Sequence, residues 1–418
     1  MRKAPGAKDY VPPPDKALTH RALLLSAVAE GTSVIVSPSR CRDVAATVSC
    51  LRRLGVRIQP SDGGLRVEGR GLRGLRRPHA ALDAGQSGTT MRLLAGLLAA
   101  QDFDSTLTGR GSLLTRPMAR VAVPLRLMGA DIRLQGGRAP LRIRGRALRA
   151  TRIRVDVPSA QVKSALLLAG LYAVGATIVT ERLRTRDHTE RLLRYFGARI
   201  RTAGRRTILR PGPLAARRVR IPGDISSAAP FIAAACLRGG PPLTIHDVGL
   251  NAGRLGFARA LRRMGADITL RPRRRKPEPS GDLVARASRL RGARFGPAEI
   301  PAMIDEIPLL ALVASQARGT TVIRGVAELR HKESDRIESL RALFKSLGLT
   351  LEARGDLLRI RGPQPLAEGL AVDAYDDHRI AMAAAVAGLL SAKGVRIMKS
   401  SCVQKSYPDF FADFLNLA

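Results

Sequence analysis

A helix that ends in glycine and runs directly into a strand recurs five times along this chain. The glycines are Gly55, Gly129, Gly197, Gly265 and Gly348, and the steps between them are 74, 68, 68 and 83 residues. Each fits the position just after a helix, where a positive φ is wanted and glycine is the usual residue. A period of about 70 residues predicts that one supersecondary unit is built repeatedly.

A second motif alternates with the first and occurs six times: a nearly apolar helix, a short break, and a β-branched strand. Examples are "RALLLSAVAEGTSVIV" near the amino terminus and "IPLLALVASQARGTTVIRG" nearer the carboxyl terminus. Helices that are apolar all round must be buried on most sides, so several of them have to share a core. The two motifs predict an α/β fold of six units, each about βαβαββ in content, with three units in each of two domains.

Two segments between the units attract attention because they are rich in arginine and proline. Residues 271–282, "RPRRRKPEPSGD", predict an exposed connection. Residues 210–224, "RPGPLAARRVRIPGD", lie near the middle of the chain and are the candidate crossover between the two domains. A chain of 418 residues is long enough for two domains with cores of their own.

Polar residues that can do chemistry recur just before or at the start of each apolar helix. Such helix ends carry free N–H groups and a partial positive charge, so they bind anions. Taken singly, Ser, Thr or Asp before a helix is most often an N-cap. Together, at equivalent positions of six repeats, these residues predict a site for a substrate with several negative groups. They are Lys16 and Arg21; Ser87, Gly88, Thr89 and Arg92; Ser159, Gln161 and Lys163; Asp224, Ser226 and Ser227; Asp305 and Glu306; and Asp377, His378 and Arg379.

The formal net charge of +37 attracts polyanions without regard to their sequence. Only ten of the 71 basic residues are lysines, however, and arginine is spread along the whole chain, which is typical of a compositional bias. Aromatic residues, on which nucleic-acid bases stack, make up only 3%. We therefore expect nonspecific polyanion binding, and a dedicated basic nucleic-acid-binding protein is the alternative from a different class.

No apolar run reaches the roughly 18 residues of a membrane span, and "MRKAPGAKDYVPPPDK" lacks the apolar core of a signal peptide. A cytoplasmic location without membrane association is expected. His20 and His188 are expected to be hydrogen-bonded structural residues, and no metal-ligand spacing occurs. The cysteines, expected to be reduced thiols, are Cys41, Cys50, Cys236 and Cys402.

Ten segments, in order and at matching spacing, resemble the signatures of the 5-enolpyruvylshikimate-3-phosphate synthase family. They are "PPDKALTHRALLLSA", "DAGQSGTTMRLLAG", "TRPM", "VPSAQVKSALLLAGL", "RDHTERLL", "IPGDISSAA", "MIDEIPLLA", "RHKESDRI", "YDDHRIAMA" and "KSYPDFF". The resemblance implies a two-domain inverse α/β barrel, with residues 14–222 in one domain and residues 1–13 plus 223–418 in the other. The hinges would lie near Pro13 and Pro222, and the active site in the cleft between the domains.

The implied reaction belongs to the shikimate pathway, which leads to chorismate and the aromatic amino acids. The enolpyruvyl group of phosphoenolpyruvate is transferred to the 5-hydroxyl of shikimate 3-phosphate, and phosphate is released by addition and then elimination. The resemblance implies no cofactor and no metal, and we expect a monomer whose partners are these two small molecules. Two phosphates and two carboxylates call for a cationic pocket, with carboxylates among the cations for proton transfer.

The family's functional residues carry over to matching positions of this chain. Asp305 would accept the proton of the 5-hydroxyl, Glu333 would handle the proton at the methylene carbon, and Lys16 would contact both substrates. The implied phosphoenolpyruvate site is Lys16, Gly88, Arg116, Gln161, Arg336, Arg379 and Lys405. The implied shikimate 3-phosphate site is Lys16, Ala17, Arg21, Ser159, Ala160, Gln161, Arg186, Asp305 and Lys332.

The run "HKESDR", residues 331–336, combines two of these cations with Glu333. Because Lys332 and Arg336 are four residues apart, they would share one face of a helix. That face would point toward the substrates, with Glu333 beside it. His331 and Asp335 are expected to act as capping or supporting groups.

Three positions depart from the family pattern: Pro14 replaces a usual Gly, Ala17 a usual Ser and Gln86 a usual Asn. A secondary-metabolism enolpyruvyl transferase with a related acceptor is therefore an alternative. The UDP-N-acetylglucosamine enolpyruvyl transferases carry a reactive loop cysteine, which is missing from "GRGSLLTRPM" in this chain. An RNA 3′-phosphate cyclase would need a nucleotide-accepting His and an ATP site, and no motif indicates either.

Overall fold

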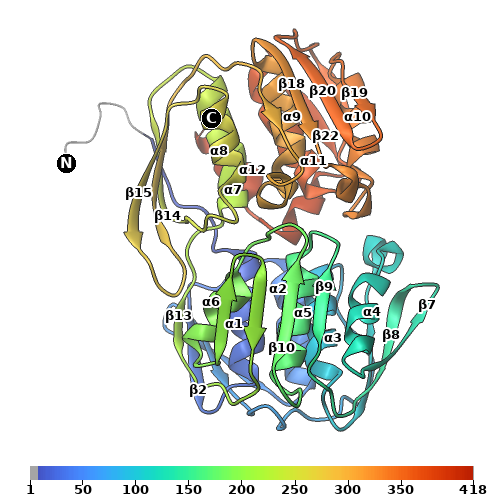
Figure 1. Ribbon diagram of the computed structural model, residues 1–418. Helices are drawn as coiled ribbons and strands as arrows, with labels where there is room; N and C mark the ends of the chain where they lie inside the picture. Colours follow the sequence, from blue (N-terminus) through green and yellow to red (C-terminus); the bar gives the residue numbers. More distant parts are fainter. Residues whose placement is uncertain (1–7, 418) are drawn as a thin grey trace. The chain divides into compact units, whose positions relative to one another are not determined.

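The computed structural model describes residues 8–417, which form two compact units. Residues 14–221 form the central unit, and residues 8–13 with 222–417 form the terminal unit (Figure 1). The chain passes from one unit to the other at residues 13–14 and again at residues 221–222. The second passage lies inside the arginine- and proline-rich segment 210–224.

The central unit consists of three repeats of βαβαββ content. The first has α1 (Lys16–Ala27), β2 (Thr32–Val36), α2 (Arg42–Arg53), β3 (Arg57–Ser61), β4 (Gly64–Glu68) and, from the end of the unit, β13 (Arg218–Arg220). The second has β5 (Leu82–Asp83), α3 (Gly88–Leu98), β6 (Asp104–Thr108), the 3₁₀ helix η1 (Gly111–Thr115), α4 (Ala119–Leu127), β7 (Asp131–Gln135) and β8 (Arg138–Arg144). The third has β9 (Arg152–Val155), α5 (Ala160–Gly170), β10 (Thr177–Glu181), α6 (His188–Tyr195), β11 (Ile200–Ala203) and β12 (Arg206–Leu209).

The terminal unit contains the other three repeats. The fourth has β1 (Lys8–Tyr10), α7 (Ile225–Leu237), β14 (Leu243–Gly249), α8 (Gly256–Arg263), β15 (Ile268–Arg274) and β16 (Ser280–Ala285). The fifth has β17 (Arg294–Phe295), η2 (Ile300–Ala302), η3 (Ile304–Glu306), α9 (Ile307–Gln316), β18 (Gly319–Arg324), η4 (Ala327–His331), α10 (Arg336–Ser346), β19 (Glu352–Arg354) and β20 (Leu357–Gly362). The sixth has β21 (Leu370–Asp373), α11 (His378–Leu390), β22 (Val395–Met398), η5 (Ser400–Lys405) and α12 (Phe410–Leu417).

Five repeats form a four-stranded sheet with the same strand order, in which the fourth strand lies between the second and the third. In the second repeat this order is β5-β6-β8-β7, with β5 and β6 parallel and the other neighbours antiparallel. The first sheet of each unit receives its first strand from a distant part of the chain, because β13 pairs with β2 and β1 pairs with β14. The predicted α/β architecture of repeated units is confirmed.

The sixth repeat departs from the expected βαβαββ content. Its strands β21 and β22 form a two-stranded sheet, and η5 and α12 follow in place of a second helix and a hairpin. In α12, Phe414 packs edge-on against Phe231 of α7 and stacks on Phe410. These rings join the hydrophobic core of the terminal unit.

The five repeated glycines end helices as the sequence predicts. Their φ angles lie between 70° and 100°. In each case the N–H of the following residue bonds to the carbonyl four residues before the glycine, as from Val56 to Leu51 and from Ala266 to Leu261. This is the Schellman arrangement, which satisfies carbonyls left open at a helix end.

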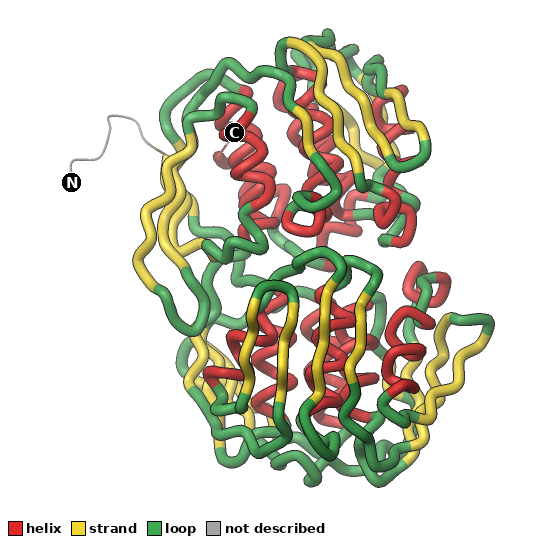
Figure 2. Tube along the Cα trace, in the orientation of Figure 1, coloured by secondary structure: helices red, strands yellow, loops and turns green. Residues whose placement is uncertain are grey.

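The nearly apolar helices form the cores of the two units, as predicted. In the central unit α3 packs against both α1 and α5, and in the terminal unit α7, α9 and α11 all contact one another. Figure 2 shows the strands β11, β12, β10 and β9 in front of the helices of the central unit. With sheets and neighbouring helices around them, these helices leave room for polar side chains mainly at their ends.

The interpretation of residues 271–282 as an exposed connection is wrong. Most of this segment lies in the antiparallel strands β15 and β16, which pair from Ile268 with Ala285 outward. The arginines near its tip are exposed, but Glu278, Ser280 and Asp282 are buried. The proline-rich composition belongs to a hairpin tip, which periodicity alone does not distinguish from a connection.

No helix within residues 8–417 is both long enough and apolar enough to cross a membrane. All four cysteines are free thiols, and Cys41, Cys50 and Cys236 are buried.

We predict that Gly265→Ala destabilises the protein by about 1–2 kcal/mol, because an L-residue is strained in the left-handed region. Gly265 has φ 100°, and the nearest atom to an added Cβ would be the Arg289 carbonyl oxygen at 3.4 Å, so the cost is conformational rather than steric. Gly239→Ala is the matched control, since this exposed glycine of the same unit has no positive φ and open space around it. Urea unfolding followed by circular dichroism measures the free energy of unfolding of both variants. Equal losses of stability would contradict a conformational requirement for glycine at position 265.

Candidate functional site

The starts of the six apolar helices are capped largely as expected. The side chains of Asp15, Ser87, Ser159, Asp224 and Asp377 each accept a bond from a backbone N–H in the first turn. The N-cap interpretation is therefore correct for "SGTT" and "GDISS". It is wrong for "IDEIP", because Glu306 at the start of α9 makes no such bond.

In the central unit, the start of α1 carries two of the predicted cations. The Lys16 ammonium lies 2.9 Å from the Asp43 carboxylate. The buried Arg21 guanidinium donates to the Thr189 hydroxyl at 2.7 Å, to the Ser164 hydroxyl at 2.9 Å and to the Ala17 carbonyl at 2.9 Å. Ala17 thus takes part through its backbone, and α1, α5 and α6 together hold Arg21 in place.

The starts of α3 and α5 are joined through Gln161. Its carbonyl oxygen accepts from Arg92 at 2.5 Å, and its amide nitrogen donates to the Thr89 hydroxyl at 2.9 Å. Gly88 leaves room for two guanidinium groups, since an added Cβ would lie 3.0 Å from an Arg116 nitrogen and 3.1 Å from an Arg92 nitrogen, so both side chains would have to shift. Two guanidinium groups therefore lie against the positive end of α3, which favours an anion as their natural partner.

The remaining predicted residues of the central unit lie at the start of α5 and on the loop before α6. Ser159 and Ala160 begin α5, next to Gln161. Arg186 is half-buried on the loop between β10 and α6, the helix that presents Thr189 to Arg21. Below, the central cluster means the cations and their neighbours at these helix starts: Lys16, Ala17, Arg21, Gly88, Arg92, Arg116, Ser159, Ala160, Gln161 and Arg186.

In the terminal unit the predicted residues gather around Arg336, whose side chain is only 1% exposed. Its guanidinium lies 2.8 Å from Asp377, 2.7 Å from Glu333 and 3.3 Å from Asp305. Burial opposes the charge on Arg336, but the carboxylates of Asp377, Glu333 and Asp305 outweigh it and raise the pKa of the guanidinium. Arg336 therefore stays charged and holds the two candidate proton-transfer residues in place.

Each candidate proton-transfer carboxylate also lies near a lysine. The Lys332 ammonium is 3.9 Å from Asp305, and the Lys405 ammonium is 3.5 Å from Glu333. Burial lowers the pKa of Lys332, although Asp305 opposes that shift. Carboxylates that lie among cations in this way are pre-organised for proton transfer beside an anionic substrate.

Arg379 and Arg254 complete the terminal cluster. Arg379 lies in the first turn of α11 and donates to the Ser226 carbonyl at 2.8 Å. Arg254 donates to Asp224 at 2.9 Å and to the Ser226 hydroxyl at 2.7 Å, and lies 3.8 Å from Asp305. Below, the terminal cluster means five cations and five carboxylates: Arg254, Lys332, Arg336, Arg379, Lys405, Asp224, Asp305, Glu306, Glu333 and Asp377.

The expected helical face of "HKESDR" is wrong, although its residues do meet. Residues 332–335 are not helical, and α10 begins only at Arg336. Asp335 accepts from the N–H groups of Ile337 and Glu338, so its capping role is confirmed and it sets the start of the helix. Lys332 approaches Asp305 from the irregular segment before the cap, not from a shared helical face.

Sequence reasoning missed Arg254 and Asp43. Arg254 lies before α8 in "NAGRLGF", away from any apolar helix start, so position in the repeat gave no signal for it. Asp43 lies in the first turn of α2, where an acidic residue is common without any function. Both become relevant only because the fold brings Asp224 and Lys16 next to them.

His20 is a structural residue, as expected. Its ring bonds to the Thr47 hydroxyl at 2.7 Å, and burial lowers its pKa to about 3. Within the part of the chain that the structure describes, no group of three or more His, Cys, Asp or Glu side chains is arranged to hold a metal ion.

The fold defines the class of protein. It matches the enolpyruvyl transferase NikO from Streptomyces tendae with a TM-score of 0.81 over 98% of this chain and 94% of that one, at 19% identity. It matches an EPSP synthase structure from Acinetobacter baumannii with a TM-score of 0.86 over 99% of this chain and 96% of that one, at 40% identity. The architecture is therefore the two-domain inverse α/β fold of the enolpyruvyl transferases.

Sequence comparison places the chain within that class. Residues 8–414 match the family of EPSP synthase (3-phosphoshikimate 1-carboxyvinyltransferase). The 3-phosphoshikimate 1-carboxyvinyltransferase of Geobacillus kaustophilus (strain HTA426) is 47% identical over 411 residues, which are 97% of this chain and 96% of that protein. That of Desulforudis audaxviator (strain MP104C) is 47% identical over 403 residues, 95% of this chain and 94% of that protein. The chain belongs to the EPSP synthase family.

We predict that Asp377→Asn destabilises the protein by about 3 kcal/mol, because it removes the most deeply buried carboxylate that pairs with the buried guanidinium of Arg336. Asp377 is fully buried, and the substitution keeps its shape and its capping oxygen. Asp373→Asn is the matched control, because its partner Lys399 is largely exposed, and it is expected to cost much less. Thermal unfolding followed by circular dichroism measures the difference, and similar losses in both variants would contradict the central place of Arg336.

Proposed function

We propose that this protein transfers the enolpyruvyl group of phosphoenolpyruvate to the 5-hydroxyl of shikimate 3-phosphate and releases phosphate. This is the transferase step of the shikimate pathway that leads toward chorismate and the aromatic amino acids. One observation carries the proposal: Asp305 and Glu333 are both held by the buried Arg336, and each also lies within 4 Å of a lysine. Two carboxylates set among cations suit proton transfer on polyanionic substrates.

The candidate proton-transfer carboxylates and the central cations lie in different units, which suggests a division of labour. Asp305 and Glu333 belong to the terminal cluster, whereas the central cluster includes five cations at or near the starts of α1, α3, α5 and α6. We infer that the central cluster supplies most of the attraction for the substrates' phosphates and carboxylates. The terminal cluster supplies the acid and the base, and both units contribute side chains to the same two substrates.

The proposed phosphoenolpyruvate ligands are mostly cations from both clusters: Lys16, Gly88, Arg116, Gln161, Arg336, Arg379 and Lys405. Guanidinium groups suit this substrate because their planar fork binds two oxygens of a carboxylate or phosphate at once. Gly88 keeps the start of α3 open beside Arg116. The proposed ligands of shikimate 3-phosphate are Lys16, Ala17, Arg21, Ser159, Ala160, Gln161, Arg186, Asp305 and Lys332.

In the proposed mechanism the oxygen of the 5-hydroxyl attacks the central carbon of phosphoenolpyruvate while Asp305 accepts the hydroxyl proton. Glu333 gives a proton to the methylene carbon, which becomes a methyl group in the tetrahedral adduct. The carbon–oxygen bond to phosphate then breaks, the Glu333 carboxylate removes a proton from the methyl group, and the proton held by Asp305 passes to the departing phosphate. The products are the enol ether and phosphate, and the cations of Lys16 and Arg336 stabilise the charge that moves to the phosphate.

Release of phosphate from a mixture of both substrates tests this function. Glu333→Gln is expected to lower turnover by about 10²-fold or more, the usual contribution of a general acid or base. Binding of shikimate 3-phosphate, measured by calorimetry, should change little. Glu338→Gln is the matched control, because this carboxylate of α10 is exposed and pairs with Arg330 at 3.2 Å. No phosphate release by the folded parent protein, or parent-like turnover in Glu333→Gln, would contradict the proposal.

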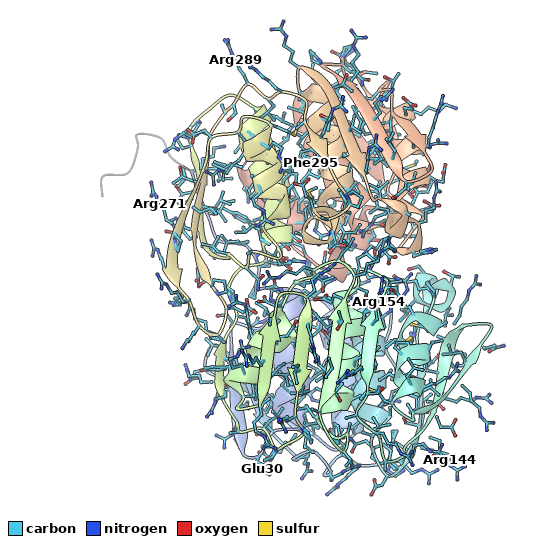
Figure 3. All side chains as sticks on the ribbon, viewed as in Figure 1. Glu30, Arg144, Arg154, Arg271, Arg289 and Phe295 are labelled. Atoms are coloured by element: carbon cyan, nitrogen blue, oxygen red, sulfur yellow. The ribbon has the colours of Figure 1, made fainter. Side chains whose placement is uncertain are left out.

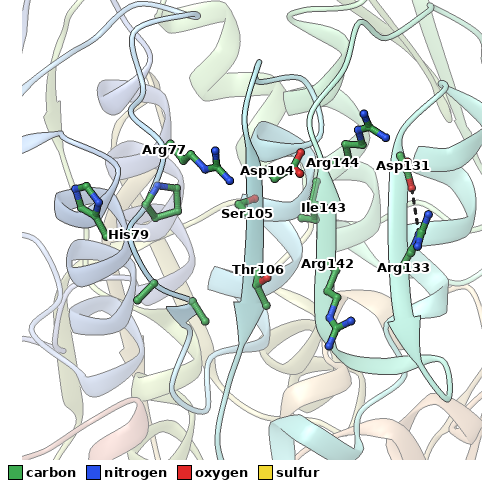
Figure 4. A pocket seen from close by; sticks show the side chains of 13 residues that line it. Arg77, His79, Asp104, Ser105, Thr106, Asp131, Arg133, Arg142, Ile143 and Arg144 are labelled. Atoms are coloured by element: carbon green, nitrogen blue, oxygen red, sulfur yellow. Dashed lines mark ion pairs between the residues drawn. The ribbon is translucent and has the colours of Figure 1, made fainter.

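We also propose that the surface arginines bind polyanions without specificity and that the chain acts as a monomer. Figure 3 shows side chains such as Arg144 and Arg271 reaching outward from the two units. A hollow of about 510 Å³ on the β5-β6-β8-β7 sheet is lined by Arg77, Arg133, Arg142 and Arg144, together with Asp104 and Asp131. Arg133 lies opposite Arg142 in the strand register, and Figure 4 shows its ion pair with Asp131. Mutual repulsion of such a surface disfavours self-association. The cytoplasmic location stays a prediction.

We predict that RNA homopolymers bind this protein at low salt and are released as salt rises from about 50 mM to about 200 mM, because the contacts are with phosphates alone. Filter binding at several salt concentrations measures this. RNA homopolymers of different bases serve as the control, and the logarithm of the binding constant should fall with the logarithm of the salt concentration at the same slope for each. Retention at high salt, or a strong preference for one base, would indicate a dedicated nucleic-acid site instead.

A further inference from the structure

One buried group of charges lies outside the proposed chemistry. Lys163, in the first turn of α5, has a side chain that is only 1% exposed. Its ammonium lies 3.0 Å from Glu181 at the end of β10 and 2.7 Å from Glu190 in α6. Both carboxylates are buried as well, and burial raises the pKa of Glu181. These three side chains tie together three elements of the third repeat, α5, β10 and α6, whose ribbons are labelled in Figure 1.

Stability alone does not explain such a group. Taking one cation and two carboxylates out of water is costly, and well-packed apolar residues often serve the fold equally well or better. The rest of α5 after this turn is almost entirely apolar, so an apolar residue at position 163 would continue the pattern of "SALLLAGLYA". A role in holding a particular geometry is the better explanation.

The geometry concerns the loop between β10 and α6. One oxygen of Glu181 accepts from the backbone N–H of Thr185 at 3.2 Å and also from the Thr185 hydroxyl. Thr185 directly precedes Arg186, which is a proposed ligand of shikimate 3-phosphate. The ion pair thus fixes the loop one residue before the guanidinium-bearing position.

Two of the same three charged residues also lie next in sequence to residues that bond to Arg21. Glu190 follows Thr189, whose hydroxyl accepts from Arg21 at 2.7 Å. Lys163 precedes Ser164, which bonds to Thr189 at 2.6 Å and to Arg21 at 2.9 Å. Lys163 and Glu190 are therefore next in sequence to residues that bond to Arg21. Glu181 bonds to Thr185, the residue that precedes Arg186.

We propose that Lys163 and Glu181 are positioning residues for the shikimate 3-phosphate subsite. They hold Thr185, and through it Arg186, in the place where the guanidinium binds an anionic group of the acceptor. This inference rests on the proposed function. Lys163 itself touches no substrate, and its effect is to reduce the ordering that the loop must undergo when the acceptor binds.

The ion pairs of Lys163 support Arg186 and Arg21, which are both proposed ligands of shikimate 3-phosphate. They do not support Arg116, Arg336 or Lys405, which are proposed ligands of phosphoenolpyruvate. Loss of Lys163 should therefore weaken the binding of shikimate 3-phosphate, whereas the binding of phosphoenolpyruvate and the rate of the chemical step should change little. A general loss of structure would weaken both substrates together.

The test compares Lys163→Met with the parent protein in steady-state kinetics. We expect the KM for shikimate 3-phosphate to rise about tenfold or more, while kcat and the KM for phosphoenolpyruvate stay within about twofold. Lys163→Arg, which keeps the charge, should recover part of the loss. Gln101→Met is the matched control, because it removes another buried polar side chain of the central unit, one bonded to the Leu97 carbonyl at 3.0 Å.

Thr185→Val keeps the ion pairs and the side-chain shape but removes the hydroxyl that bonds to Glu181. It should raise the KM for shikimate 3-phosphate in the same direction, and it decides the question alone if Lys163→Met does not fold. Equal rises in both KM values, or an unchanged KM for shikimate 3-phosphate in the folded variants, would overturn the inference. An inactive parent protein would instead contradict the proposed function, so the two failures are distinguishable.

Discussion

The burial of nearly apolar helices decides where polar chemistry is possible in this protein. The helices α1, α3, α5, α7, α9 and α11 are enclosed by neighbouring helices and by sheets, so functional side chains have room mainly at their ends. At the amino-terminal ends, free N–H groups and the helix dipole favour negative charge. A protein built from six such helices is therefore suited to substrates that carry several anionic groups.

The buried guanidinium of Arg336 organises the chemically active end of the terminal unit. It binds the nearby carboxylate of Glu333 and two carboxylates from more distant parts of the sequence, Asp305 and Asp377. Because a buried cation requires such partners, the two proposed proton-transfer residues are fixed before any substrate arrives. In the central unit, Arg21 is fixed in a comparable way by hydroxyls of α5 and α6. Both clusters are thus pre-organised by networks that the fold itself requires.

The sequence predicted much of this because the repeat is visible in its spacing. The five glycine motifs and the six apolar helices already differed in number by one, and the shortened sixth repeat accounts for that difference. What the sequence did not reveal were contacts between segments far apart, such as Arg254 with Asp224 or Lys163 with Glu190. Local patterns also failed at residues 332–335, where the Asp335 cap shifts the helix start and changes which residues share a face. Such contacts depend on tertiary packing between the elements within a repeat, which no local period records.

The central claim is that one pair of substrates is bound by side chains of both the central and the terminal cluster. A crystal structure of the protein with shikimate 3-phosphate and an unreactive analogue of phosphoenolpyruvate tests it most directly. The claim predicts that the acceptor phosphate contacts the central cluster, while its 5-hydroxyl lies within hydrogen-bond distance of Asp305. Both ligands bound to one cluster alone, with Asp305 and Glu333 remote from the reacting atoms, would contradict it.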